Sequence, residues 1–596
     1  MDYSKLNEAQ ARAVRSDSPK ILTLAGAGTG KTHVLTHRIA RLYEDGVLPS
    51  NMLAITFTRA AGSEMQDRII NMIGPQGKEL SCSTFHSWCL RIIRRYASRL
   101  GYKSNLSVYD EEDVLSIVTH IIEDYNYDAE PKKFIKAMGE YYVHGVMLPP
   151  DMRSLFEEFK FVMKRNNAMT FDMILDSMKY LIKYDDVSDY LQSKYTHVFV
   201  DEFQDSDKRQ LRILELIDFE NLFVVGDDFQ SIYSFSGADI NGILNMAQDP
   251  EIEVIKLEEN YRSGREITEP ANRLIKHNNQ TEKVLISPRS STGEGVVLYR
   301  TLDTLEEKQT VKAEIRLLMD EVEPEEIAVL TRTNKQAYEI AEHLKQEDIP
   351  VYVKGSNSDI FNTSEAKGIA SWLGALLNPA DDEAMKKASD YPEASLTWME
   401  KQKVELNQLE KRLSFLESME DMSVGLIFTM RFRHLQGQFE ALDDIKSIQM
   451  LPKYINQEYI SKGLTNRADR VTEIVAKILE YLNEGNTLEE WLEWYKTRNI
   501  DSTLYDVNDG KGCVQVMTLH KSKGLEFDSV FIMGCREKNL PFSKGNLEEE
   551  RRLFYVGMTR AKNSLYLSYP ENIEKYAGSG YMVEAESSRF LEEMRG

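Results

Sequence analysis

The chain has 596 residues, of which 42% are hydrophobic and 28% charged, and its formal net charge is −23. This length is more than one hydrophobic core supports, so the chain is expected to fold as several domains of ordinary globular composition. The acidic balance argues against a protein that coats nucleic acid non-specifically, although it is compatible with a motor that confines positive charge and stacking side chains to one groove.

Targeting and metal-binding signals are missing from the sequence. The N-terminus, MDYSKLNEAQ, is polar, and no apolar run approaches the ~20 residues that span a bilayer. We therefore expect a cytoplasmic protein with no membrane contact. The four cysteines suit a reducing compartment, fit no zinc or iron–sulfur spacing, and are expected to be buried or incidental thiols. They are Cys82, Cys89, Cys513 and Cys535.

The first predicted element is a strand at Lys20–Leu24, followed by the glycine-rich segment AGAGTGKT (25–32) and an apolar helical pattern that begins at Val34. This is the layout of a P-loop. Its glycines let backbone N–H groups surround nucleotide phosphates, while Lys31 reaches the β- and γ-phosphates and the Thr32 hydroxyl can bind Mg²⁺. Loose matches to this pattern arise by chance, but the flanking strand and helix favour an NTPase.

Apolar β-type runs alternate with helical patterns along the rest of the chain, which is typical of parallel sheets covered by helices. The strands cluster in two zones, about 1–260 and about 260–375 with 510–570. The predicted strands are Met52–Phe57, His197–Val200, Leu222–Val225, Val296–Tyr299, Ile327–Leu330, Val514–Met517 and Val530–Met533.

Two segments, about 90–190 and about 378–510, lack strand signals and are predicted to be helical. The second contains two apolar stripes that indicate packed helical cores. The stripes are Val471, Ile474, Val475, Ile478, Leu479 and Leu482, and Leu406, Leu409, Leu413 and Leu416. The pattern predicts two α/β domains, each interrupted by a helical insertion.

Two carboxylates, Asp201 and Glu202, end the apolar strand Val198–Val200. Acidic pairs are common on protein surfaces. At a strand end in a P-loop protein, however, the first carboxylate holds Mg²⁺ and the second orients and deprotonates the attacking water. We therefore interpret this pair as a Walker B motif.

Polar and aromatic residues follow the next strand. Gln230 is placed to sense a γ-phosphate, and Tyr233 and Phe235 come directly after it. Aromatic residues at a sheet rim are usually core or lid residues, but next to a phosphate sensor they can also form a platform on which bases stack.

Arginines with motif context occur later in the chain, at Arg262 in EENYRSG and at Arg551, Arg552 and Arg560 in ERRLFYVGMTRAK. An isolated arginine is more often part of a surface ion pair, which is worth little. An arginine donated to a γ-phosphate by a second α/β domain would stabilise transition-state charge and couple hydrolysis to cleft closure.

Taken together, these segments resemble the UvrD/PcrA/Rep family of superfamily-one DNA helicases, and they occur in the order of the family's motifs. The resembling segments are LNEAQARAV (6–14), AGAGTGKT (25–32), LAITFTRAAGSEMQDRI (53–69), STFHSW (83–88), VDEFQD (200–205), VGDDFQSIYSFSGA (225–238), LEENYRSG (257–264), VMTLHKSKGLEFDSVFI (516–532) and EEERRLFYVGMTRAK (548–562).

The resemblance implies ATP and Mg²⁺ as cofactors and gives roles to matching residues. Thr32 and Asp201 are expected to hold the metal. The residues expected in catalysis are Lys31, Asp201, Glu202, Gln230, Arg262 and Arg560. The residues expected around the nucleotide are Gln10, Ala25, Gly26, Ala27, Gly28, Thr29, Gly30, Lys31, Thr32, His33, Tyr261, Arg262, Glu526 and Arg560. Those expected along the DNA are Phe57, His86, Tyr233, Phe235 and His520.

Three positions depart from the family pattern. His33 stands where the family usually has arginine, which puts base selectivity or nucleotide affinity in doubt. Phe235 replaces a tryptophan and offers less stacking area, and Ser236 replaces a cation.

The implied fold is α/β, with two RecA-like P-loop domains that have parallel sheets, each interrupted by a helical insertion domain. The first domain comprises 1–90 and 191–260 and carries an insertion at 91–190. The second comprises 261–377 and 511–596 and carries a regulatory insertion at 378–510.

The implied function is that of an ATP-dependent DNA helicase and translocase moving 3′→5′ on single strands and unwinding duplex in DNA repair, replication or recombination. Its expected partners are single-stranded DNA and single/double-strand junctions, with the protein acting as a monomer or weak dimer. Two alternatives stay open. One is a translocase that displaces bound proteins with little unwinding, and the other is a nucleotide-switched DNA-binding recruitment protein.

Overall fold

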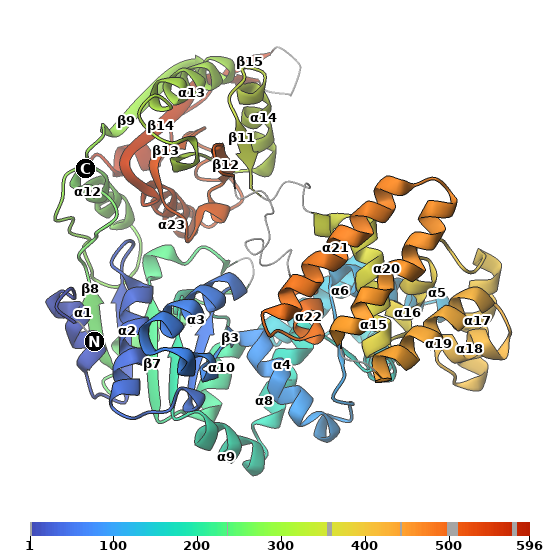
Figure 1. The fold of residues 1–596 in the computed structure, drawn as a ribbon. Helices are drawn as coiled ribbons and strands as arrows, with labels where there is room; N and C mark the ends of the chain where they lie inside the picture. Colours follow the sequence, from blue (N-terminus) through green and yellow to red (C-terminus); the bar gives the residue numbers. More distant parts are fainter. Residues whose placement is uncertain (1–2, 235–236, 355–359, 442–443, 498–509, 575–580) are drawn as a thin grey trace. The chain divides into compact units, whose positions relative to one another are not determined.

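A computed structural model describes residues 3–234, 237–354, 360–441, 444–497, 510–574 and 581–596 (Figure 1). The chain forms two compact units. Unit 1 comprises Met1–Phe85, Ser188–Ser356 and Asp506–Gly596, and unit 2 comprises His86–Val187 and Asn357–Tyr505. Within the described ranges, no helix has the length and apolar character needed to cross a membrane.

The first sheet of unit 1 is entirely parallel, and Figure 1 draws it in blue and green. Its apolar strands are buried because helices cover a parallel sheet. In spatial order the strands are β3 (Ser81–Thr84), β2 (Met52–Thr56), β6 (His197–Val200), β7 (Asn221–Gly226), β1 (Lys20–Ala25) and β8 (Glu253–Leu257). The helices of this half are α1 (Glu8–Arg15), α2 (Lys31–Glu44), α3 (Arg59–Ile73), α10 (Lys208–Ile217) and α11 (Asn241–Gln248).

The second sheet of unit 1 is parallel except for its last strand pair. In order it contains β11 (Val351–Val353), β12 (Val514–Thr518), β10 (Ile327–Thr331), β13 (Phe527–Ile532), β14 (Ala561–Glu574) and β15 (Met582–Glu584), and β9 (Gly295–Asp303) also pairs with β14. Its helices are α12 (Arg265–Ile275), α13 (Thr304–Leu318), α14 (Asn334–Lys345), α23 (Leu547–Met558) and α24 (Arg589–Glu593). We call these parts the first-sheet half and the second-sheet half.

The predicted α/β class is confirmed, and each predicted strand coincides with a strand of one of these sheets. The sequence does not predict five strands of these sheets, which are β3, β8, β11, β14 and β15. The division of the sequence into four domains stays a prediction, because each compact unit combines two of the predicted parts.

Unit 2 contains both helical insertions. The first insertion comprises α4 (Phe85–Arg95), β4 (Ser107–Tyr109), α5 (Glu111–Asp124), α6 (Pro131–His144), α7 (Arg153–Arg165), β5 (Ala168–Thr170), α8 (Phe171–Leu181) and α9 (Asp185–Lys194), whose last residues lie in unit 1. The expectation that this segment lacks strands is wrong, since β4 and β5 pair in parallel.

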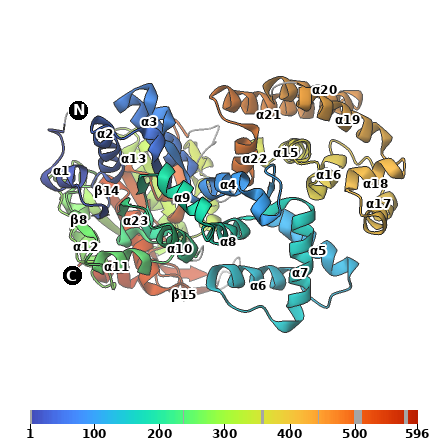
Figure 2. The same ribbon diagram turned by 90° about the horizontal axis from the view of Figure 1, so that it is seen from below.

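The second insertion is entirely helical over its described residues. It comprises α15 (Ser364–Leu377), α16 (Asp382–Ser389), α17 (Trp398–Lys411), α18 (Phe415–Asp421), α19 (Leu426–Ala441), α20 (Asp444–Ser461), α21 (Thr465–Asn483) and α22 (Leu488–Thr497). Figures 1 and 2 show α20 and α21 packed side by side.

One predicted apolar stripe is confirmed and the other is wrong. On α21, Val471, Ile474, Val475, Ile478 and Leu482 are buried in the core of unit 2, and Leu479 packs against them. The leucine stripe is split between two helices. Arg412 adopts a left-handed conformation after α17, and a capping box formed by Ser414 and Glu417 starts α18. Leu416 is therefore buried, while Leu406 and Leu409 are exposed.

A polar seam joins the two insertions inside unit 2. The buried Asp113 carboxylate of the first insertion accepts the ammonium groups of Lys387 and Lys496, each at 2.5 Å. Nearby, the Tyr109 hydroxyl donates to Asp381 Oδ1 at 2.6 Å. Burial raises the pKa of Asp381 to about 6, although its hydrogen bonds act in the opposite direction. The charge of Asp113 is thus compensated by two ammonium groups, whereas Asp381 accepts hydrogen bonds only from uncharged donors.

The raised pKa of Asp381 predicts a stability that depends on pH. A carboxyl whose pKa is higher in the folded than in the unfolded state stabilises the fold below its unfolded pKa of 3.8, and this contribution is lost as pH rises through about 6. The variant Asp381→Asn keeps the acceptor for Tyr109 and does not titrate. We expect its stability advantage over wild type to grow by about 1 kcal/mol between pH 5 and pH 8.

Tryptophan fluorescence during urea unfolding can measure this difference, because all five tryptophans belong to unit 2. They are Trp88, Trp372, Trp398, Trp491 and Trp494. The exposed Asp128→Asn is the matched control and should show no such growth. An advantage of Asp381→Asn that stays constant across this pH range would contradict the burial of an ionisable carboxyl at this position.

Candidate active site

The P-loop connects β1 to α2 at the carboxyl edge of the first sheet. Gly28 and Gly30 have φ values of 68° and 83°, in the left-handed region that favours glycine. A Cβ atom on Gly28 would also lie 2.7 Å from the Cβ atom of Arg262. The loop then opens into α2, whose first-turn N–H groups have no partner inside the helix and can receive an anion.

Residues from other segments hold the carbonyl groups of this loop. Gln10 Nε2 donates to the Thr29 carbonyl at 3.0 Å, and Asn260 Nδ2 donates to the Ala27 carbonyl at 2.7 Å. The backbone N–H of Tyr261 donates to the Gly28 carbonyl. Because these hydrogen bonds fix the carbonyl groups of the loop, its backbone N–H groups stay available for phosphate oxygens.

Asp201 and Glu202 follow β6 directly, and Glu202 has a φ of 48°. Lys31 Nζ lies 3.2 Å from Glu202 Oε2. Burial opposes ionisation of both carboxyls. Lys31 and Lys523 reverse this effect at Glu202 and lower its pKa, whereas burial and the charge of Glu202 raise the pKa of Asp201. The two carboxyls thus differ in pKa, and the lowered pKa of Glu202 keeps it ionised and able to accept a proton.

Hydrogen bonds continue from Glu202 across the first sheet to the second-sheet half. Gln204 Nε2 donates to Glu202, and Gln204 Oε1 accepts the N–H of Asp227 at 2.8 Å. Asp227 Oδ2 accepts Gln230 Nε2 at 2.6 Å, and Gln230 Oε1 accepts Arg560 Nη2 at 3.3 Å. We call the set Lys31, Glu202, Gln204, Asp227, Gln230 and Arg560 the contact chain.

Arg560 is a buried cation with neutral partners. Its guanidinium donates to the carbonyls of Val556 and Leu525 as well as to Gln230, and the residue is 1% exposed. In the described part of the chain, no carboxylate lies within ion-pair distance of it. Burial and the charge of Arg262 lower the pKa of Arg560 to about 9, so it stays charged at neutral pH. An unpaired buried charge is costly, and a phosphate would compensate it.

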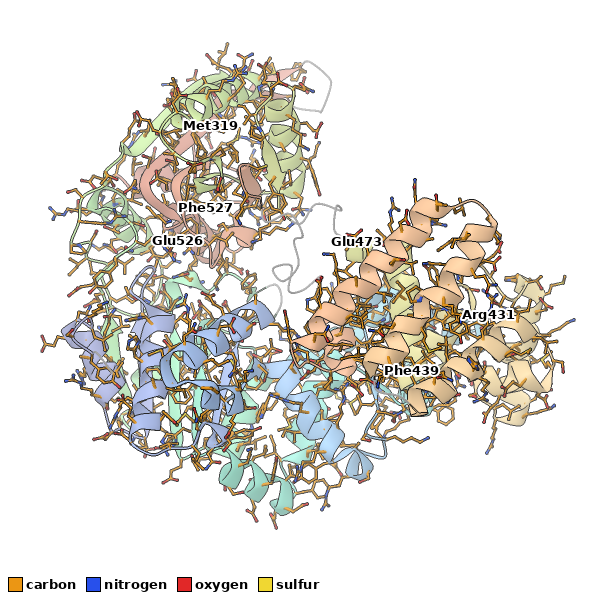
Figure 3. All side chains as sticks on the ribbon, viewed as in Figure 1. Met319, Arg431, Phe439, Glu473, Glu526 and Phe527 are labelled. Carbon is orange, nitrogen blue, oxygen red and sulfur yellow. The ribbon has the colours of Figure 1, made fainter. Side chains whose placement is uncertain are left out.

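Arg262 and Glu526 contact each other. Arg262 Nε donates to Glu526 Oε2 at 2.6 Å, and its Nη1 donates to the Thr559 carbonyl. Glu526, labelled in Figure 3, directly precedes β13 and is exposed. Burial opposes ionisation of Glu526, but the neighbouring Arg262 lowers its pKa. The expected roles of Arg262 at the γ-phosphate and Glu526 at the ribose stay predictions.

The residues expected near the base lie at the edge of the P-loop. Tyr261 is 47% exposed, and its hydroxyl accepts Asn7 Nδ2 and donates to Glu259. Gln10 is buried and holds the P-loop carbonyl described above. His33 is exposed, and its ring centroid lies 4.0 Å from that of His37. An exposed tyrosine ring beside the P-loop is suited to stacking on a base.

Three of the residues expected along DNA come together in unit 1. The rings of Phe57 and Tyr233 stack with centroids 5.2 Å apart and an interplanar angle of 19°. The Tyr233 hydroxyl bonds the carbonyl of His520, and Lys523 Nζ lies 4.9 Å from the Tyr233 ring centroid. Burial, together with nearby Arg332, lowers the pKa of His520 to about 4, so its imidazole is neutral at pH 7.

The other two expected residues are placed differently. His86 belongs to unit 2, where its ring meets Phe171 edge-on at 5.7 Å. Phe235 lies outside the described residues, as does Ser236. Among the described residues, no group of three or more His, Cys, Asp or Glu side chains is arranged to hold a metal ion.

Comparison with known proteins agrees with this geometry. Residues 6–251 match the UvrD/REP helicase N-terminal domain, and residues 255–572 match the UvrD-like helicase C-terminal domain. The chain belongs to the UvrD/REP helicase family. The family resemblance inferred from the motifs is thereby confirmed.

Relatives of this UvrD/REP family member include proteins named ATP-dependent DNA helicase PcrA. The protein from Staphylococcus epidermidis is 30% identical over 632 residues, covering 99% of this chain and 86% of its own length. The protein from Bacillus subtilis is 33% identical over 617 residues, covering 95% and 82% respectively. The protein from Staphylococcus aureus strain MRSA252 is 31% identical over 634 residues, with coverage of 99% and 86%.

Sequence reasoning missed three polar residues of this UvrD/REP site. Gln204 and Asp227 lie inside quoted motifs, at VDEFQD and VGDDFQ, but their types alone do not show that they connect Glu202 to Gln230. Asn260 also lies in a quoted motif, and its bond to a carbonyl 233 positions away carries no local signal.

The charge state of Glu202 predicts the behaviour of Glu202→Gln in this UvrD/REP site. The amide keeps the size of the side chain but cannot accept a proton from water. We expect the turnover number of ATP hydrolysis to fall by about 10²-fold or more. Binding of a fluorescent ATP analogue should persist, whereas Lys31→Ala should lose both binding and turnover. Glu215→Gln, exposed on α10, is the matched control. Near-normal steady-state phosphate release by Glu202→Gln would show that another group activates the water.

Proposed function

We propose that this UvrD/REP family member is an ATP-dependent DNA helicase that moves 3′→5′ along single strands and unwinds duplex DNA. The contact chain is the observation that carries this proposal. It begins at Lys31 in the P-loop and ends at Arg560 in the second-sheet half. A γ-phosphate bound next to Lys31 would therefore influence groups from both halves, and its loss would change how the halves are held together.

The same segment connects the nucleotide to DNA. Tyr233 follows Gln230 by three residues and stacks on Phe57 of the first-sheet half. Stacking on aromatic side chains is tolerant of sequence, because every base has a flat π-face. A shift of Gln230 would thus be passed through a very short stretch of backbone to a platform suited to single strands.

The donor groups at the P-loop fit a Mg²⁺ ion that accompanies ATP. The Thr32 hydroxyl and the Asp201 carboxylate are hard oxygen ligands, and Mg²⁺ is typically held by one or two such groups together with substrate phosphates and water. When bound, Mg²⁺ would neutralise charge on the phosphates. Lys31 would hold the phosphates, Glu202 would take a proton from the attacking water, and Arg560 would stabilise the charge that develops on the γ-phosphate.

The substrate class and direction of movement are part of the proposal. The likeness to DNA helicases supports DNA over RNA, and the 3′→5′ direction follows from the family resemblance. We propose single strands and single/double-strand junctions as substrates, in DNA repair, replication or recombination, with a monomer or weak dimer as the active form. Such a substrate agrees with the cytoplasmic location expected from the sequence.

Strand displacement on matched substrates tests this function. We expect ATP-dependent unwinding of a duplex with a 3′ single-stranded tail and little unwinding of duplexes with a 5′ tail or blunt ends, because loading requires a single strand of the correct polarity. ATP hydrolysis should be stimulated by single-stranded DNA. Glu202→Gln is the inactive control.

Three results would contradict the proposal in different ways. Unwinding only from a 5′ tail would reverse the polarity. Stimulated hydrolysis with displacement of bound protein but no unwinding would favour the translocase alternative. DNA binding that changes with nucleotide, without sustained turnover, would favour the recruitment protein.

A further inference from the structure

Lys283 is a buried lysine in a segment that none of the recognised motifs covers. Its side chain has no exposed surface, and its Nζ atom lies 2.6 Å from Asp227 Oδ1 and also contacts Asp228. The ammonium lies 3.9 Å from the centroid of the Phe229 ring. Burial alone would lower the pKa of Lys283, but the two carboxylates outweigh burial and raise it. The lysine is therefore charged, and Asp227 and Asp228 share one cation.

The backbone that carries Lys283 is bonded to both halves. After β8 of the first sheet, Glu258 accepts the Val284 N–H with its Oε1 atom at 2.8 Å and the Ile286 N–H with its carbonyl. Helices of the second-sheet half hold the same segment from the other side. Asn272 on α12 exchanges two hydrogen bonds with the backbone of Leu285, at 2.7 and 3.1 Å. Asn278 Nδ2 donates to the Glu548 carbonyl on α23 at 2.8 Å. Asp227 and Asp228 directly follow β7 of the first sheet. Lys283 thus brings a positive charge to these carboxylates from a segment that is bonded to both halves.

Asp227 uses both of its carboxylate oxygens. Oδ1 meets Lys283 and also accepts the N–H of Phe229 at 3.1 Å, while Oδ2 accepts Gln230 Nε2 at 2.6 Å. Because Gln230 donates with its amide nitrogen to Asp227, its amide oxygen is directed to Arg560. The orientation of the Gln230 side chain therefore depends on where the Asp227 carboxylate is held.

We propose that Lys283 is a positioning residue for ATP hydrolysis, which holds Asp227 so that Gln230 presents its side chain to Arg560 at the γ-phosphate side of the cleft. This inference rests on the proposed ATPase function. Lys283 does not touch the reacting groups and acts through Asp227. Through Asp227 it supports the contact of Gln230 with Arg560, which is one of the contacts between the two halves.

A simpler role for Lys283 is to neutralise two buried carboxylates. Variants of Asp228 can distinguish this charge compensation from the positioning of Asp227. Asp228 accepts the Thr281 N–H at 2.7 Å and the Thr281 hydroxyl, whose oxygen lies 2.8 and 2.9 Å from the two carboxylate oxygens, and it shares Lys283 with Asp227. Its carboxylate is not bonded to Gln230. Changing Lys283→Met together with Asp228→Asn removes one charge of each sign and leaves the net charge of the cluster unchanged. Asp228→Asn alone keeps the pair of Lys283 with Asp227.

The test compares these variants in single-strand-stimulated ATP hydrolysis and in thermal unfolding. We expect Asp228→Asn to keep a turnover number within about twofold of wild type. The charge-balanced double variant should lose at least about tenfold in kcat, because small displacements of an oriented group are costly, with KM for ATP changed by less than about threefold. Its melting temperature should fall below that of Asp228→Asn, because Asp227 is left buried without a cation, so kcat is compared well below both melting temperatures.

A further arm shows whether the effect passes through Gln230. Adding the double change to Gln230→Ala should lower kcat no further, because the side chain that Lys283 positions is already gone. Equal kcat in the double variant and in Asp228→Asn would overturn the proposal and leave Lys283 as a charge-compensating residue. A full further loss in the Gln230→Ala background would overturn it as well.

If the methionine variants do not fold, Lys283→Arg decides the question. It keeps the charge but replaces a compact ammonium with a planar group, so charge compensation alone predicts wild-type kcat, while positioning predicts a reduced kcat with KM retained. Wild-type kcat in Lys283→Arg would then overturn the proposal. Absence of stimulated hydrolysis in the wild-type protein would instead refute the proposed function, so the two failures are distinguishable.

Discussion

The hydrogen bond between Arg560 and Gln230 is the contact on which the site depends. A guanidinium buried in protein without a carboxylate partner is costly, and here neutral carbonyls, Gln230 and the Thr559 hydroxyl hold it. These groups satisfy its hydrogen bonds but do not balance its charge. A bound phosphate would do so, which makes the second-sheet half sensitive to the nucleotide held by the first.

Other contacts around the P-loop also involve both halves, as the sensitivity of Arg560 to the nucleotide requires. Asn260 and the backbone of Tyr261, which follow β8, hold the P-loop carbonyls, and Arg262 reaches Glu526 before β13. Loss of the γ-phosphate would leave Arg560 uncompensated next to Gln230, and Gln230 is three residues from the aromatic platform at Tyr233. In the proposed function, chemistry and strand binding would thus share one short segment. Unit 2, by contrast, is held together by its own apolar core and by the polar seam at Asp113.

Much of the fold and of the nucleotide site could be predicted from sequence, because the signals are local. Lys31 lies within a glycine-rich turn, and Asp201 lies at the end of an apolar strand, so a few neighbouring residues define each of them. The stripe from Val471 to Leu482 was predicted correctly for the same reason, since it lies within one helix. The polar strand β3 has no apolar run, and its pairing with β2 defines it instead.

Other features depend on contacts between distant residues or on helix ends. Lys283 and Asp228 are 55 positions apart in sequence, and nothing near either residue indicates their contact. The leucine stripe failed because its periodicity continues across a helix end at Arg412, where the backbone turns left-handed. Gln204 lies within the recognised motif VDEFQD. Its role becomes evident only from the structure, in which it bonds Glu202 on one side and Asp227 on the other.

A double-mutant cycle on Gln230 and Arg560 tests the central claim most directly. Single-turnover ATP hydrolysis is measured with saturating single-stranded DNA for wild type, Gln230→Ala, Arg560→Ala and the double variant, together with ATP affinity. If the two residues act as one unit, each single change should lower the rate strongly, ATP affinity should change little, and the double variant should be no slower than the slower single variant. Rate losses that multiply in the double variant would show that the two side chains act independently and would contradict the account.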